Sequence, residues 1–161
     1  AGEAVLQARS IGRRRASGFT FIELMLAVLI VGVLTAIAVP AFNRYIDRTR
    51  GDRAQVDIAA LSLLIDMYFL NNGGYPASLA VIGEGGRLDP WGRPYQYLNL
   101  SDPGARGFAR KDHSLVPINT DYDLYSMGRD GRTAPPLTAQ HSRDDIVRAN
   151  NGKFVGLASG Y

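Results

Sequence analysis

The sequence predicts an α+β protein, in which a long N-terminal helix packs on a small three-stranded antiparallel sheet with a C-terminal loop region. Two observations support this prediction. In residues 19–72 an apolar run passes directly into a segment with helical amphipathic spacing, so both can belong to one helix. After residue 74 the chain changes to short segments separated by glycine and proline, which is typical of strands and turns. With 161 residues, the chain has room for one modest domain besides the helix.

The net charge of the chain is concentrated at its N-terminal end. The formal net charge is +3, and the four arginines and one glutamate of residues 1–18 account for all of it. Because the remainder is formally neutral, we expect no nucleic-acid-binding surface. The sequence contains no cysteine, which excludes disulfide bonds and cysteine-ligated zinc.

The apolar run of residues 19–42 is long enough, as a helix, to cross the hydrocarbon core of a membrane. It contains a single acid, Glu23, near its start. A charged group inside such a span costs about 2.5–3.5 kcal/mol on insertion scales, so its presence indicates a function. A plain signal-anchor helix explains the apolar run and the arginines at residues 13–15, but neither the Gly18-Phe19 junction nor Glu23.

Pro40 lies near the far end of the apolar run, and it has two interpretations. Proline removes a backbone donor and clashes with the preceding turn, so we expect a kink or local unwinding there. Alternatively, Pro40 simply ends the membrane-spanning helix.

Residues 43–72 continue the helix with an amphipathic pattern. Apolar residues recur at spacings of three and four, which places them on one helical face. The residues of this face expected to pack on the sheet are Ile58, Leu61, Leu64 and Ile65. The residues at 71–74, Asn-Asn-Gly-Gly, end the helix because they tolerate left-handed backbone.

Three later segments read as strands: residues 95–98, 122–126 and 153–157. Alternation in the first two predicts one face covered by the helix and one wetter face. The two histidines of the chain, His113 and His141, have no metal-binding spacing and belong to no catalytic constellation. We therefore expect that the protein is not an enzyme.

Residues 17–24 read SGFTFIEL and resemble the prepilin-type leader junction of type IV pilins and type II secretion pseudopilins. In that family a membrane aspartyl peptidase cuts after the glycine and methylates the new N-terminal phenylalanine. The acid at the fifth position after the cut is needed for assembly. The resemblance thus implies cleavage between Gly18 and Phe19, N-methylation of Phe19, and an assembly role for Glu23.

Two later motifs resemble the major pseudopilin of type II secretion, the G-type. Residues 88–97 read LDPWGRPYQY and resemble its Asp-Pro-Trp-Gly-x-Pro-Tyr-x-Tyr signature, and residues 122–131 read YDLYSMGRDG and resemble its Tyr-Asp-x-x-Ser-x-Gly-x-Asp-Gly segment. The resemblance covers most of residues 18–146 and implies a type IV pilin-like fold. The domains then follow in chain order: 1–18 prepilin leader, 19–42 transmembrane helix, 43–72 periplasmic half of the helix, and 73–161 globular α+β region.

The resemblance implies a structural subunit that assembles, after leader removal, into the periplasmic pseudopilus of a type II secretion system. It implies a single-pass inner-membrane precursor with a periplasmic C-terminal domain, and then a helical homo-oligomeric filament. The implied partners are a prepilin peptidase, an inner-membrane assembly platform and minor pseudopilins. Two alternatives stay open: a type IV pilin or competence pseudopilin, and a membrane-anchored binding or enzymatic domain.

Acidic residues flank a long loop at residues 131–142. Calcium takes six to eight oxygen ligands, commonly carboxylates mixed with backbone carbonyls. The resemblance implies that calcium binds here, with Asp130, Asp144 and Asp145 as side-chain ligands and the Met127 carbonyl as a further ligand. By spacing alone, an Asp-Gly turn at Asp130 and a helix cap at Asp144 explain the same residues. The composition of this loop and the tail beyond Val147 both depart from the family pattern.

Overall fold

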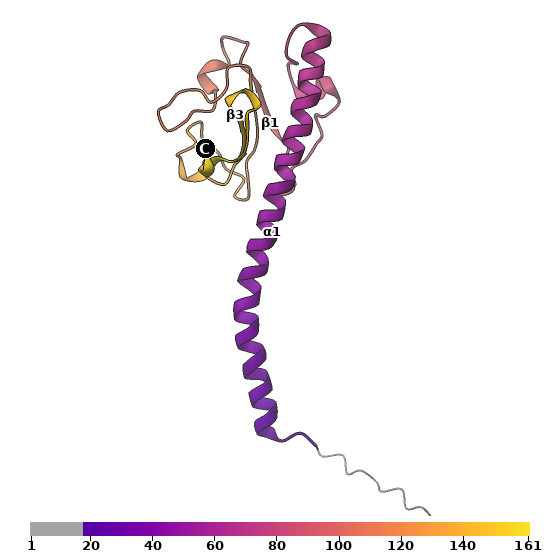
Figure 1. The fold of residues 1–161 in the computed structure, drawn as a ribbon, viewed down its shortest axis with the longest axis vertical. Helices are drawn as coiled ribbons and strands as arrows, with labels where there is room; N and C mark the ends of the chain where they lie inside the picture. Colours follow the sequence, from indigo (N-terminus) through magenta and orange to yellow (C-terminus); the bar gives the residue numbers. More distant parts are fainter. Residues whose placement is uncertain (1–17) are drawn as a thin grey trace, which may run out of the picture. The chain divides into compact units, whose positions relative to one another are not determined.

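The computed structural model of the chain describes residues 18–161 (Figure 1). The described residues fall into two compact units, residues 18–41 and Phe42–Tyr161, and each is treated by itself. The predicted leader, apart from Gly18, lies outside the described residues.

Helix α1 spans Phe21–Asn72, 52 residues. Its N-terminal part has its apolar side chains exposed, and it is long and apolar enough to cross a membrane. The helix continues through Pro40, so the local unwinding and the helix end considered from the sequence are both absent here. The helix terminates as predicted: Gly73 has a φ of 72°, and its N–H donates to the Phe69 carbonyl at 2.8 Å.

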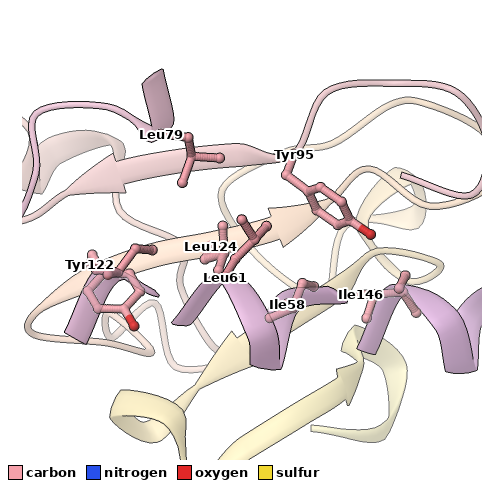
Figure 2. Packing of buried hydrophobic residues seen from close by; sticks show 9 residues of the cluster. Ile58, Leu61, Leu79, Tyr95, Tyr122, Leu124 and Ile146 are labelled. Carbon is pink, nitrogen blue, oxygen red and sulfur yellow. The ribbon is translucent and has the colours of Figure 1, made fainter. Parts of the chain in front are cut away.

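Within the second unit, the C-terminal half of α1 packs on one face of a sheet. The helix residues buried there are Ala54, Ile58, Leu61 and Ile65, which follow one another at spacings of four, three and four. Figure 2 shows Ile58 and Leu61 close to Leu124 of the sheet, and Tyr95 and Tyr122 belong to the same cluster. Burying an aliphatic side chain of this size stabilises the fold by about 1.5–3 kcal/mol. Leu64, predicted to be a core residue, is only half-buried.

The sheet has four antiparallel strands that pair in chain order. They are β1 (Gln96–Asn99), β2 (Tyr122–Ser126), β3 (Ile146–Ala149) and β4 (Phe154–Leu157). Strands β1, β2 and β4 correspond to the three predicted segments, and the α+β class is confirmed. The predicted count of three strands is wrong, because β3 was not recognised in the sequence.

The face of the sheet opposite the helix is also covered. A second apolar cluster, on this side, contains Ile118, Leu137, Val147, Ala149 and Ala158. All four residues of β3 are buried. The prediction of a wetter face is therefore wrong: the segment before β2 and the loop at residues 131–142 bring Ile118 and Leu137 over this side.

Candidate functional site

The junction that precedes α1 is exposed and closes with a reciprocal pair of hydrogen bonds. Gly18 and Phe19 lie outside the helix, and Phe19 is 89% exposed. The Thr20 N–H and hydroxyl both donate to Oε2 of Glu23 at 2.8 Å, and the Glu23 N–H donates to the Thr20 hydroxyl at 3.3 Å. This is a capping box, with Thr20 as the N-cap residue and Glu23 at the third helical position.

The capping box gives the carboxylate of Glu23 partners within its own chain. It satisfies backbone N–H groups that have no backbone carbonyl partner at the start of the helix, and it places a negative charge at the positive end of the helix dipole. Thr20 is a functional candidate that the sequence analysis missed. The pattern Thr-x-x-Glu before an apolar run was the available signal.

The first downstream motif is organised by one buried carboxylate, Asp89, which is 4% exposed. Its Oδ1 accepts the backbone N–H groups of Trp91 and Arg93 at 3.0 and 2.9 Å. Its Oδ2 accepts the hydroxyl of Ser126, at the end of β2, at 2.6 Å. Asp89 therefore fixes the Pro90-Trp91-Gly92 bend and ties it to the second motif. Trp91 is partly buried and packs against the helix–sheet core.

Arg93 links the same bend to the turn that follows β2. Its guanidinium donates to the Gly128 carbonyl at 2.7 Å and to the Arg129 carbonyl at 3.2 Å. Gly131 has a φ of +69°, and a Cβ there would overlap the guanidinium of Arg93. Gly128 has a φ of +59°, and a Cβ there would overlap the carbonyl of Asp144. Asp89 and Arg93 thus join the two motifs by hydrogen bonds into one structural unit, called the bracket below. These contacts hold the backbone in place and form no reactive centre.

The four predicted calcium ligands lie beside this turn, but each has a different partner. The Met127 carbonyl accepts the Gly131 N–H at 3.2 Å. Asp130 contacts the ring of His141 at 3.2 Å and accepts the Arg132 N–H at 2.7 Å. That backbone hydrogen bond, supported by His141, lowers the pKa of Asp130.

The two adjacent acids of the site, Asp144 and Asp145, have different surroundings. Asp144 accepts the Asp130 N–H at 2.9 Å through Oδ2. Asp145 is fully buried and forms an ion pair with Arg110, with Nη2 and Oδ2 2.5 Å apart. Burial raises the pKa of Asp145 to about 6, while hydrogen bonding by Thr133 and the charge of Arg110 oppose that rise.

As arranged, the four residues do not form one calcium site. Among residues 18–161, no group of three or more acidic or histidine side chains is placed to hold a metal ion. The buried acid of the set, Asp145, is already paired with a cation from the protein, and Asp130 turns to His141. The predicted ligand set therefore does not fit a shared ion in this structure. Calcium binding itself stays a prediction.

Arg110 is a second residue that the sequence analysis missed. It is 3% exposed and lies in the segment between β1 and β2, 35 positions before its partner Asp145. Nothing in its sequence neighbourhood, Ala-Arg-Lys-Asp, distinguishes it from a surface arginine. Its role depends on a contact that only the fold creates.

These features define a class of protein. A helix suited to span a membrane begins at a Gly-Phe-Thr-x-x-Glu junction and continues into a small α+β unit, which fits a membrane-anchored, pilin-like subunit. The family described as "Prokaryotic N-terminal methylation motif" matches residues 13–39.

Among curated proteins, the chain is similar over most of its length to several called type II secretion system core protein G. It is 35% identical to that of Pseudomonas aeruginosa in an alignment that covers 74% of this chain and 88% of the relative. It is 31% identical to that of Klebsiella pneumoniae in an alignment that covers 87% of this chain and 99% of the relative. The identity to that of Vibrio cholerae is 30%, in an alignment that covers 74% of this chain and 84% of the relative. The chain belongs to the family of type II secretion system core protein G.

Proposed function

We propose that the chain is the major structural subunit of a type II secretion pseudopilus, and that it is not an enzyme. The observation that carries this proposal is the family membership, with similarity that extends through the globular unit. Relatives of this name favour the secretion filament over the type IV pilin or competence alternative. The bracket formed by Asp89 and Arg93 supports the same function, because its contacts are structural.

Maturation begins with removal of the leader. The bond between Gly18 and Phe19 lies outside α1, two residues before the helix begins, so its backbone is not engaged in helical hydrogen bonds. A membrane-embedded prepilin peptidase cleaves there and methylates the new amine of Phe19. The methylation motif that matches residues 13–39 supports this step.

Assembly then uses the charge that cleavage creates. Before cleavage, the backbone nitrogen of Phe19 is a neutral amide, and afterwards it is a cationic amine. In the filament, Glu23 of one subunit pairs with the Phe19 amine of a neighbour. A carboxylate and an amine that meet in a medium of low dielectric attract each other strongly, so the pairing favours assembly and fixes the register of the subunits.

The location follows from the same steps. The precursor is a single-pass protein of the inner membrane, with the leader in the cytoplasm and the C-terminal unit in the periplasm. The mature subunit enters a periplasmic filament with other copies of itself and with minor pseudopilins, on an inner-membrane assembly platform. The filament drives export of folded proteins across the outer membrane.

Replacement of Glu23 tests this function. We expect Glu23→Ala to insert and to be cleaved by the peptidase, yet to form no filaments in cells that carry the secretion machinery. Electron microscopy and shearing assays measure the filaments, and a mass shift of the N-terminal peptide reports cleavage and methylation. Glu84→Ala, which removes a partly exposed acid outside the helix, is the matched control. Filaments of normal length from Glu23→Ala would disprove the assembly role, and long extracellular fibres from the wild type would favour the pilin alternative.

A further inference from the structure

The buried ion pair of Arg110 and Asp145 lies at the base of the loop at residues 131–142. Their side chains are 3% and 0% exposed. Placing two charges in such an environment costs several kcal/mol for each ion unless geometry and additional hydrogen bonds compensate. The other hydrogen bonds of Arg110 therefore decide whether this cost is compensated.

The guanidinium of Arg110 binds oxygen atoms from both sides of the loop. Its Nη1 donates to the Ala134 carbonyl at 2.7 Å and to the hydroxyl of Thr133, and Nη2 binds the carboxylate of Asp145. The Thr133 hydroxyl donates to the same carboxylate at 2.6 Å. The guanidinium also lies over the ring of Tyr125 in β2, 4.4 Å from its centroid. One side chain thus joins the loop, the residue before β3, and β2.

The backbone of Arg110 is fixed by neighbouring segments, so its side chain is presented from a defined position. Its N–H donates to Oδ2 of Asp123 at 2.7 Å, and its carbonyl accepts the Ile118 N–H at 2.9 Å. Asp123 is itself held by the side-chain amide of Asn119 at 2.9 Å. The backbone of Arg110 is therefore already ordered, and only its side-chain rotamers remain to be fixed when the guanidinium engages the loop.

The oxygen atoms that surround the guanidinium are of the kinds that a hard divalent cation prefers: a carboxylate, a backbone carbonyl and a hydroxyl. We propose that the guanidinium of Arg110 replaces a metal ion, as a built-in cation that fastens the loop at residues 131–142 to the sheet, so that this loop closes without calcium. The planar fork of arginine binds several oxygens at fixed angles, which a lysine ammonium does not.

A second cation at the same carboxylate is disfavoured. The other oxygen of Asp145, Oδ1, is buried and has no hydrogen-bond partner among the described residues. A divalent ion bound there would lie a few ångströms from the guanidinium. Like charges at that separation, with little solvent to screen them, repel each other strongly. Arginine and calcium are therefore alternatives at this position rather than partners.

The first test measures whether wild-type stability depends on calcium. The full chain in detergent micelles is melted in EGTA, in millimolar calcium chloride and in equal magnesium chloride as a control for general ionic effects. We expect the Tm to differ by no more than about 1 °C among the three, since an ion that does not bind the native state does not stabilise it. A saturable rise of several degrees with calcium alone would overturn the proposal.

The second test asks whether Arg110 and Asp145 stabilise the chain as a pair. Arg110→Gln leaves a buried carboxylate unpaired, and we expect the Tm to fall by on the order of 10 °C. Adding Asp145→Asn to Arg110→Gln removes that unpaired charge, and we expect it to restore part of the lost Tm. The single variant Arg110→Lys keeps the charge but not the planar fork, so its Tm is expected to lie below that of the wild type. Arg129→Gln is the matched control, because its ion pair with Asp47 is largely exposed, and its Tm changes by about 2 °C at most.

The double variant decides the second test. If its loss equals the sum of the two single losses, the residues are not coupled and the proposal fails. If Arg110→Gln does not fold, the milder Thr133→Ala, which removes one hydroxyl from the guanidinium, replaces it. A Tm of Thr133→Ala that equals the wild-type Tm would then contradict the fastening role.

Discussion

At the scale of single residues, the chain uses carboxylates to hold segments that are distant in sequence. Asp89 joins its own bend to the end of β2, and Asp145 is joined by Arg110 to the loop that precedes it. Glu23 acts over a shorter range, because its carboxylate accepts the Thr20 N–H and so closes the first turn of α1. Each of these three acids thus accepts hydrogen bonds from other parts of the chain in the fold.

The loss of Asp89 is expected to destabilise the globular unit strongly. Asp89→Ala leaves the buried N–H groups of Trp91 and Arg93 and the Ser126 hydroxyl without their acceptor, which costs about 3–5 kcal/mol of unfolding free energy. Denaturant unfolding monitored by tryptophan fluorescence measures this loss. Asp112→Ala is the matched control, because Asp112 accepts two backbone N–H groups in a more exposed turn, and about 1 kcal/mol is expected. Equal losses in the two variants would contradict a special role for Asp89.

A methyl group at Gly128 is expected to disrupt the turn beside the acidic loop. Gly128→Ala adds a Cβ where the Asp144 carbonyl already lies and imposes a φ of +59° on alanine, so a loss of about 3 kcal/mol or more is expected. Gly73→Ala separates the two causes, because Gly73 has a φ of +72° with open space around its Cβ position. Its loss should be about 1 kcal/mol. Equal unfolding midpoints for the two variants would refute the steric explanation.

At the scale of elements, the interface between α1 and the sheet is rich in tyrosine. Tyr95, Tyr97 and Tyr122 lie in it, and burial raises the pKa of each phenol well above the usual value. A folded-state pKa above the unfolded value near 10 means that these groups contribute stability fully below about pH 10 and lose it as pH rises further. The interface is therefore sensitive to alkali.

A spectroscopic titration checks this sensitivity. We expect the buried tyrosines Tyr95, Tyr97 and Tyr122 to ionise only together with unfolding, which the loss of circular dichroism reports. Tyr122→Phe, which removes one buried phenol, should shift alkaline unfolding to higher pH. A single step near pH 10 for all tyrosines in a chain that stays folded would refute the prediction.

The elements differ in how far the sequence alone predicts them. Helix α1 and strands β1, β2 and β4 were predictable, because their apolar spacing and their flanking turn residues act locally. Strand β3 was not predictable from the sequence, because its apolar pattern is interrupted by Arg148, an arginine that is buried in the fold. Arg148 is 3% exposed, pairs with Asp121 at 2.6 Å, and lies 3.9 Å from the ring centroid of Tyr122. Its burial depends on partners that lie 26 and 27 positions away.

The same distinction applies to the candidate site. The Gly18-Phe19 junction and Glu23 are identified by a compact local motif, whose functional roles remain predictions. The acids around residues 131–142 could be identified as candidates from the sequence. The direction in which each carboxylate points could not be predicted from it. Arg110 and Thr133 orient Asp145, His141 contacts Asp130, and the Asp130 N–H holds Asp144, and the chain brings these partners together only on folding.

At the scale of the whole molecule, the tail after β3 is a structural part of the globular unit. Strand β4 pairs with β3 over four residues, and Ala158 belongs to the apolar cluster on the face away from the helix. The Tyr161 hydroxyl donates to the side chain of Asn150 at 2.8 Å. Removing the tail would expose an edge of β3 and open this cluster.

Truncation tests that role. A chain that stops at Asn150 is expected to lose cooperative unfolding of the globular unit and to become sensitive to protease, because β4 and Ala158 are gone. A chain that lacks only Tyr161 loses the hydroxyl hydrogen bond to Asn150, the backbone hydrogen bond to the Ala158 carbonyl and the ring contact with Phe154, and should keep a cooperative transition. Calorimetry of both variants in detergent measures the transitions. An unchanged transition in the shorter chain would show that the tail is dispensable.

The stabilisation given by a cation that is part of the polypeptide does not depend on a free concentration, whereas that given by a dissolved ion does. The stabilisation that a bound ion gives a fold rises with its free concentration relative to the dissociation constant, so dilution or a chelating medium weakens it. The guanidinium of Arg110 is covalently part of the same chain as the carboxylate of Asp145, 2.5 Å away, so neither dilution nor a chelator removes it. On the proposal made for Arg110, the stability of the loop at residues 131–142 is therefore expected to be independent of the calcium concentration of the medium.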